Sequence, residues 1–178
     1  GYRALKLLLD KRPEFLETIT TERWEKWTPA IVAVPNASQH EDSFLELAKY
    51  AYQNAPQTYT EILTSLIDKE NEQHEYLFVI NLLEKCWDEP LKLMLLSKAT
   101  DAKLHPKCIS QLLEVLLKQD FAEAKDFAKS LISFPLPSND KDRQKALIAC
   151  RVLVENSDPS TWSFLWKFIQ QNSTFGRE

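Results

Sequence analysis

Four short polar junctions, each between two segments with an apolar stripe, recur along this chain of 178 residues. They are centred on Asn54, Asp88, Asp120 and Asp158, which are 34, 32 and 38 residues apart. Asparagine and aspartate favour the N-cap of a helix, and a proline, glutamine or glutamate follows each of them within three positions. The spacing predicts stacked helical hairpins, in which each pair of helices buries its apolar face against its neighbours.

Glycine is nearly absent, since Gly1 and Gly176 are the only two in the chain. β-Hairpins need glycine in their turns, and nucleotide-binding α/β folds need it in their phosphate loops. We therefore predict an all-α fold, namely an α-solenoid of about four to five antiparallel helix pairs of the HEAT-like, α-α superhelix type. The same shortage excludes a phosphate loop, a dinucleotide fingerprint and a G-x-S-x-G nucleophile elbow.

The apolar stripes predict one helical repeat domain over residues 1–178. Residues 1–40 form an irregular N-terminal pair, with helices over 2–11 and 14–27 and a short helix that begins at Thr28 and Pro29. Four regular pairs follow, over residues 41–71, 74–100, 105–133 and 140–172. In the second of these pairs we expect residues 75–87 to be helical. The chain begins at Gly1 rather than at a methionine, and we expect a fragment of a longer protein.

The charge is concentrated in one segment. The whole chain carries a net charge of −4, whereas residues 41–75 contain eight acidic and only two basic residues. A solvated helix face is the simpler interpretation, and a basic or polar protein partner is the alternative. Within this segment Glu70, Glu72 and Glu75 are candidates for an interaction face.

The three cysteines, Cys86, Cys108 and Cys150, lie far apart, and each falls within an apolar stripe. We expect them to be buried, and their odd number without a signal peptide predicts reduced thiols in the cytoplasm. No apolar run is long enough to span a bilayer. His40, His74 and His105 lie on successive units, too far apart to share one zinc ion. We therefore expect no metal, no cofactor and no catalytic residue.

A modest basic cluster is formed by Lys125, Lys129, Lys141, Arg143 and Lys145. A helical repeat protein that binds nucleic acid would use such a patch. Here Asp126, Asp140 and Asp142 lie between the basic residues and offset their charge. We therefore do not expect nucleic acid as a partner.

The last predicted helix is rich in aromatic residues. Trp162, Leu165, Trp166 and Ile169 form one stripe, and Phe164 and Phe168 form a second stripe on a different side. A helix that is apolar on two sides is normally buried between neighbours. A following repeat, a partner protein or a second copy of the chain would each cover the second side, and we favour the following repeat.

The terminal residues 162–169, together with Phe175, Gly176, Arg177 and Glu178, resemble the ends of repeats in large bacterial NACHT-type (STAND) signalling NTPases. The resemblance is to the HEAT-like C-terminal regions of that family, which lie beyond the ATPase core. It implies a sensor or scaffold role, with the ATPase residues elsewhere in the protein.

These observations predict a non-catalytic scaffold or sensor segment of a larger intracellular signalling protein, whose partner is a protein or its own parent chain. Trp162, Phe164, Trp166 and Phe168 are candidates for its interaction face, beside the three glutamates. A HEAT-like repeat protein that binds nucleic acid is the first alternative, and an unrecognised all-α enzyme is the second.

Overall fold

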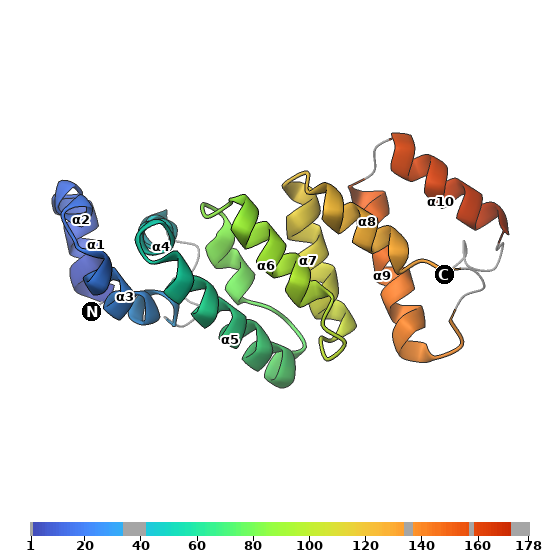
Figure 1. Ribbon diagram of the computed structural model, residues 1–178, viewed down its shortest axis with the longest axis horizontal. Helices are drawn as coiled ribbons and strands as arrows, with labels where there is room; N and C mark the ends of the chain where they lie inside the picture. Colours follow the sequence, from blue (N-terminus) through green and yellow to red (C-terminus); the bar gives the residue numbers. More distant parts are fainter. Residues whose placement is uncertain (1, 34–41, 134–136, 157–158, 172–178) are drawn as a thin grey trace. The chain divides into compact units, whose positions relative to one another are not determined.

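The computed structural model describes residues 2–33, 42–133, 137–156 and 159–171. Within these ranges the regular structure consists of ten α-helices and one 3-10 helix, without a β-strand (Figure 1). The predicted all-α fold is therefore confirmed. None of the helices in these ranges has both the length and the apolar character needed to cross a membrane.

The contacts divide the chain into two compact units, Gly1–Met94 and Leu95–Glu178. Seven of the described helices begin in the first unit: α1 (Tyr2–Lys11), α2 (Glu14–Glu17), α3 (Thr21–Val32), α4 (Asp42–Asn54), α5 (Pro56–His74), the 3-10 helix η2 (Val79–Leu83) and α6 (Glu89–Ala99). The second unit begins within α6 and contains α7 (Pro106–Lys118), α8 (Ala122–Ser130), α9 (Asp140–Glu155) and α10 (Pro159–Gln171). The single repeat domain over 1–178 stays a prediction.

The first unit is organised around α4, which contacts α1, α3, α5 and η2. Its apolar residues Phe44, Leu47, Ala48 and Ala51 have no exposed surface. Trp24 of α3 is also fully buried, and its ring stacks on that of Tyr50 at a centroid distance of 6.1 Å. Burial of these side chains stabilises the unit because it removes a large apolar area from water.

The second unit is organised around α7 and α9. These two helices contact each other, both contact α8, and α10 packs on α9. Leu112, Leu113 and Leu116 of α7 are fully buried, and the facing positions of α8 and α9 are small buried alanines: Ala124, Ala128, Ala146 and Ala149. Small side chains let the helix axes approach, so the leucines of α7 fill the space between them.

Three of the predicted pairs consist of consecutive helices that pack on each other: α4 with α5, α7 with α8 and α9 with α10. They lie within the predicted segments 41–71, 105–133 and 140–172, except that α5 continues to His74. Pro159 is the first residue of α10, as predicted. A proline is tolerated there because the first helical amide has no intrahelical acceptor.

The prediction that residues 75–87 form a helix is wrong. Glu75 adopts the left-handed conformation with φ of 51°, which ends α5, and the following segment contains only the short helix η2. The carboxylate of Glu70 accepts the N–H of Val79 at 3.0 Å. That N–H is therefore not available for the helical bond to the carbonyl of Glu75.

The predicted N-terminal helices also differ from the structure. The expected helix over 14–27 is interrupted after Glu17, where the hydroxyl of Thr18 donates to the carbonyl of Phe15 at 2.8 Å. Such a local bond competes with continuation of the helix. Thr28 and Pro29 do not begin a new helix, because Pro29 lies inside α3. The hydroxyl of Thr28 donates to the carbonyl of Trp24 at 2.8 Å, which satisfies the hydrogen bonding of a fully buried side chain.

Of the four predicted helix caps, Asp88 is confirmed. Its carboxylate accepts the N–H of Leu91 at 2.9 Å, three residues into the turn that opens α6. Asp158 lies outside the described residues. Asn54 is not a cap of α5 but the last residue of α4, and its amide donates to the carbonyl of Tyr50. The N-cap of α5 is Ala55, which is buried, so the tight junction leaves little room for a polar side chain.

Asp120 is also not an N-cap, because it lies at the C-terminal end of α7 with φ of 52°. Its N–H donates to the carbonyl of Leu117 at 3.0 Å, and the N–H of Phe121 donates to that of Leu116 at 3.2 Å. These two bonds define a Schellman motif, and the burial of Leu116 and Phe121 is its usual hydrophobic contact. A residue in this conformation terminates α7 and lets α8 begin two residues later.

We expect Asp120→Gly to raise the free energy of unfolding by about 0.5–1 kcal/mol, because only glycine adopts the left-handed conformation without a steric penalty. Urea unfolding followed by circular dichroism measures the change. The matched control is Asp126→Gly, an exposed site inside α8, which we expect to lose about 0.3–0.5 kcal/mol through lower helix propensity. A destabilised Asp120→Gly variant would contradict the Schellman assignment.

We expect Leu116→Ala to lower the free energy of unfolding by about 2–5 kcal/mol, because the side chain has no exposed surface and its removal leaves a cavity. The control is Leu93→Ala on α6, where the leucine is 50% exposed. We expect its cost to stay below about 1 kcal/mol. Equal losses in the two variants would show that Leu116 is not part of the core.

Candidate functional site

Helix α10 has one side packed on the second unit and one side exposed. Thr161 and Leu165 are buried, with exposed fractions of 0% and 2%, whereas Trp162 and Trp166 are 47% and 50% exposed. The two tryptophan rings stack at a centroid distance of 6.4 Å. Residues four apart lie on the same side of a helix, so Thr161 and Leu165 face inward while both tryptophans face outward.

The predicted stripe of Trp162, Leu165, Trp166 and Ile169 is thus divided, because Leu165 belongs to the packed side. Phe164 is half-buried, and the ammonium group of Lys129 from α8 lies 6.0 Å from the centroid of its ring. This cation–π contact links the side chains of α8 and α10. The side chain of Phe168 lies outside the described residues. Of the four aromatic candidates, the structure places Trp162 and Trp166 together at the surface.

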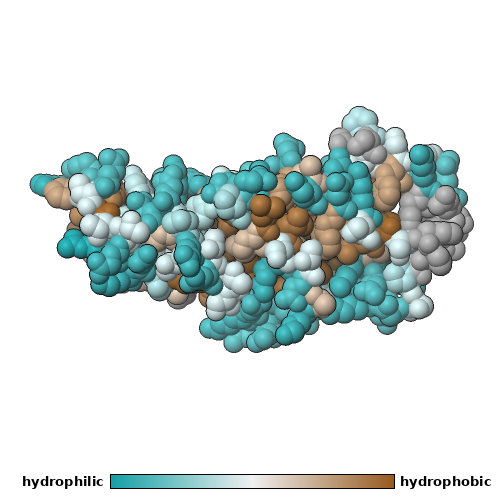
Figure 2. All heavy atoms as spheres, in the orientation of Figure 1, coloured by the Kyte–Doolittle hydropathy of each residue, from teal (hydrophilic) through white to brown (hydrophobic). Residues whose placement is uncertain are grey.

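The three glutamate candidates near the end of α5 have different environments. Glu70 is half-buried and accepts the N–H of Val79, as described above. Burial raises the pKa of its carboxyl group, and the hydrogen bonds from the amides of Val79 and Phe78 oppose that rise. Glu72 and Glu75 are exposed, at an end of α5 that is covered by hydrophilic residues in Figure 2. Glu70 therefore has a structural role as an acceptor for the amide of Val79, and Glu72 and Glu75 are surface residues.

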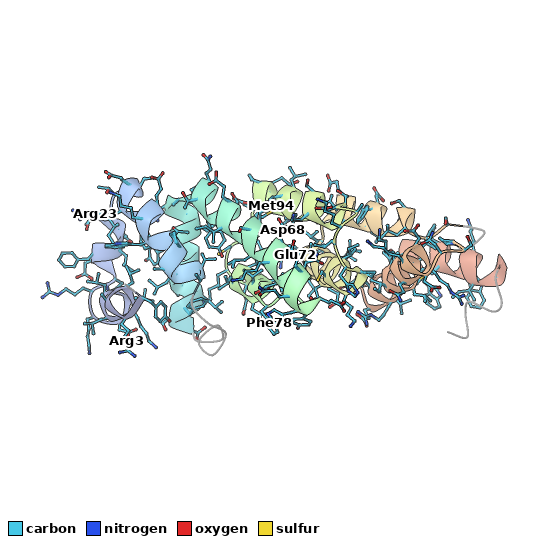
Figure 3. The ribbon with its side chains drawn as sticks, turned by 90° about the horizontal axis from the view of Figure 1, so that it is seen from below. Arg3, Arg23, Asp68, Glu72, Phe78 and Met94 are labelled. Atoms are coloured by element: carbon cyan, nitrogen blue, oxygen red, sulfur yellow. The ribbon has the colours of Figure 1, made fainter. Side chains whose placement is uncertain are left out.

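Sequence reasoning missed an aromatic cluster directly after α5. The rings of Tyr76 and Phe78 lie 4.8 Å apart, and the ring of His74 lies 5.9 Å from that of Phe78. Figure 3 shows Phe78 on the connection that follows α5, and Asp68 and Glu72 on the helix itself. Tyr76 and Phe78 alternate with the buried Leu77 and Val79. Because Tyr76, Leu77, Phe78 and Val79 are all apolar, the sequence pattern carried no signal of which two stay at the surface.

A group of buried titratable side chains lies between α4, α5 and the start of α6. The hydroxyl of Tyr52 donates to the carboxylate of Asp88 at 2.5 Å, and that of Tyr59 donates to the carbonyl of Leu82 at 3.3 Å. Burial raises the pKa of both tyrosines, and it raises the pKa of the Cys86 thiol to about 11. A thiol with this pKa is protonated at neutral pH and is a poor nucleophile. The cluster is therefore suited to packing rather than to covalent chemistry.

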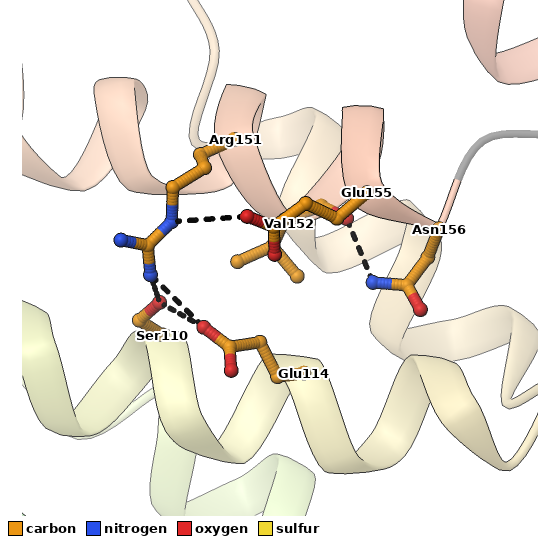
Figure 4. Close-up of polar contacts among 6 residues, drawn as sticks. All are labelled: Ser110, Glu114, Arg151, Val152, Glu155 and Asn156. Atoms are coloured by element: carbon orange, nitrogen blue, oxygen red, sulfur yellow. Dashed lines mark hydrogen bonds and ion pairs between the residues drawn. The ribbon is translucent and has the colours of Figure 1, made fainter.

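In the second unit, Arg151 of α9 joins α7 through a polar network (Figure 4). Its guanidinium group donates to the hydroxyl of Ser110 at 2.7 Å and to the carboxylate of Glu114 at 2.9 Å. The hydroxyl of Ser110 donates to the same carboxylate oxygen at 2.9 Å. Ser110 is 2% exposed, so these bonds satisfy a buried polar group. The network orients α9 on α7 and leaves Arg151 half exposed.

The predicted basic cluster is engaged within the second unit. Besides the contact between Lys129 and Phe164, Lys141 donates to the carbonyl of Ala102 at 2.7 Å, and Lys145 lies 3.7 Å from Asp142. Asp142 and Lys145 also line an open cavity of about 230 Å³ beside Ser130 and Ser133. In the described ranges no three histidine, cysteine, aspartate or glutamate side chains are grouped so that they would hold a metal ion.

Comparisons with models of known protein families, with curated proteins and with solved structures gave no match to this chain. The surfaces described above are therefore the basis for a functional proposal.

We expect Glu70→Gln to be more stable than the wild type at pH 7, because the amide oxygen still accepts the N–H of Val79 without a half-buried charge. The folded-state pKa of Glu70 is raised, so the folded protein binds the proton more tightly and the penalty of the charge is lost as pH falls through that pKa. The difference between variant and wild type should therefore vanish below the ordinary glutamate pKa. Urea unfolding of both proteins, at intervals of about one pH unit between pH 4 and pH 8, measures this difference in stability.

The matched control is Glu72→Gln, since Glu72 is an exposed glutamate on the same helix. We expect its stability difference from the wild type to change little over the same pH range. The opposite result is that the stability of Glu70→Gln relative to wild type is lower at pH 7 than at pH 4. It would show that the hydrogen bonds to the Glu70 carboxylate stabilise its charge by more than burial destabilises it.

Proposed function

We propose that this chain is a non-catalytic scaffold or sensor segment, built as a solenoid of antiparallel helix pairs, that binds a protein or its own parent chain through the outer side of α10. The observation that carries the proposal is the exposed, stacked pair of Trp162 and Trp166. A single exposed apolar side chain is common, but two adjacent large rings keep a considerable apolar area in contact with water.

Burial of that area in a complex is favourable at about 25 cal/mol per Å². Tryptophan is among the residues that contribute most to protein–protein interfaces, because its large ring loses little conformational entropy on binding. The ring stacking also holds both side chains in one arrangement before a partner arrives, which reduces the entropic cost of association. The geometry of α10 therefore fits protein recognition.

The packing of α4 on α5, α7 on α8 and α9 on α10 supports a solenoid of helix pairs. The resemblance of the terminal segment to repeat ends of NACHT-type signalling NTPases supports a sensor or scaffold role in a larger intracellular signalling protein. Nucleic acid binding receives less support, because Lys129, Lys141 and Lys145 have partners within the second unit.

Site-specific photo-crosslinking tests this proposal. A benzophenone amino acid replaces Trp162 or Trp166 in the protein expressed at its natural level, and crosslinked products are identified after irradiation. We expect both positions to crosslink to one and the same polypeptide, either a partner protein or the parent chain. The matched control position is Leu7 of α1, which is 60% exposed and lies on the other unit.

An excess of wild-type protein should reduce crosslinking to this polypeptide, whereas an excess of the double variant Trp162→Ala/Trp166→Ala should reduce it little. The double variant should retain the helical content of the wild type. Products that are the same at positions 7, 162 and 166 would contradict a specific surface on α10. A double variant that unfolds would show that the two tryptophans belong to the core.

A further inference from the structure

We propose that the turn after α5 is a second docking surface, and that it receives an arginine- or lysine-bearing segment of a protein partner. We call the residues 74–79 the aromatic turn. The inference rests on the proposed function only in that the chain binds proteins, since the aromatic turn lies in the first unit and α10 lies in the second.

The backbone of the aromatic turn is held in place from the inside. Leu77 and Val79 have exposed fractions of 0% and 1%, and the N–H of Val79 is bonded to the carboxylate of Glu70. Glu75 in the left-handed conformation turns the chain back at the end of α5. With Leu77 and Val79 buried on the inside, the rings of Tyr76 and Phe78 reach the surface, Tyr76 exposed and Phe78 half-buried.

The outward side chains form a compact aromatic surface. The rings of Tyr76 and Phe78 lie 4.8 Å apart at an interplanar angle of 57°, and His74 contacts Phe78 edge-on at 79°. Tyr76 is 47% exposed, His74 is exposed and Phe78 is half-buried. Because the backbone is already fixed, binding of a ligand to these rings has only a small entropic cost for ordering them.

The charge around the aromatic turn selects the partner. The last two turns of α5 and the residue after them carry four acidic residues, Asp68, Glu70, Glu72 and Glu75, against two basic residues, Lys69 and His74. Glu72 and Glu75 are exposed at this end of the helix. The faces of aromatic rings attract cations, and nearby carboxylates add to that attraction, whereas an acidic segment would be repelled. A guanidinium or ammonium group stacked on Tyr76 and Phe78 would interact favourably with both the aromatic rings and the nearby carboxylates.

The probe is a capped peptide of alternating arginine and glycine, and a peptide of alternating glutamate and glycine is its charge-reversed control. Both are titrated into the full chain with ¹³C-labelled aromatic rings, and binding is followed by NMR. We expect the ring signals of Tyr76 and Phe78 to shift saturably with the arginine peptide and not with the glutamate peptide.

We expect Tyr76→Ala to weaken binding of the arginine peptide by about two- to fivefold, as for an exposed cation–π contact. Phe15→Ala is the matched control, because Phe15 is also an exposed aromatic residue of the first unit, 45% exposed, and lies away from the acidic end of α5. Its affinity for the peptide should equal that of the wild type. Tyr76→Leu, which keeps an apolar side chain of good size, should weaken binding as Tyr76→Ala does.

Two results would overturn the inference. In one, the arginine peptide shifts signals near acidic residues throughout the chain and leaves the rings of Tyr76 and Phe78 unmoved. In the other, Tyr76→Ala and Tyr76→Leu both bind as the wild type does. If either result is obtained while α10 crosslinks specifically, only the proposed binding by the aromatic turn is contradicted. If the peptide binds at Tyr76 while Trp162 and Trp166 do not crosslink specifically, only the proposed role of α10 is contradicted.

Discussion

The α-helices that the structure describes depend on burial of one of their faces against a neighbour. The described α-helices other than α2 have 9 to 19 residues, and helices in proteins owe most of their stability to tertiary packing. Their stability therefore comes from apolar contacts such as those of Phe44 and Leu47 in the first unit and Leu112 and Leu116 in the second. Polar bonds, such as those of Arg151 with Ser110 and Glu114, then fix how the packed helices are oriented.

This dependence explains why the ends of helices matter so much in the fold. A helix that packs along its length must stop where its neighbour stops, and the chain reverses there in one or two residues. Asp120 and Glu75 achieve this by adopting the left-handed conformation, although neither is a glycine. With its two glycines at positions 1 and 176, the chain has none available at these turns. Each turn is instead supported by buried apolar residues on its C-terminal side, Phe121 in one case and Leu77 in the other.

The same principle identifies the surfaces with a proposed role. Among the exposed large apolar side chains, which also include Leu7, Phe15, Leu93 and Val154, Trp162 and Trp166 on α10 and Tyr76 on the aromatic turn each lie against another aromatic ring. The two tryptophans lie next to the buried Leu165 on α10, and Tyr76 lies next to the buried Leu77. These buried neighbours fix the backbone that carries the exposed rings. Carboxylates, including the exposed Glu72 and Glu75, lie beside the aromatic turn. This surface is therefore suited to a cationic partner segment.

The all-α class followed from the sequence because the near absence of glycine and the apolar stripes are local properties. For the same reason Asp88 and Pro159 were correctly placed at the start of helices. The sequence did not distinguish an N-cap from a C-terminal turn at Asn54 and Asp120, since both residue types suit either position and the choice depends on which side chains are buried nearby. Nor did it reveal the aromatic turn, because the N–H of Val79 donates to the carboxylate of Glu70, nine residues earlier, and residues 75–87 therefore do not continue as a helix. Local chemistry thus determined where helices are favoured, whereas tertiary packing decided where they end and which aromatic residues stay at the surface, because burial depends on neighbours that are distant in the chain.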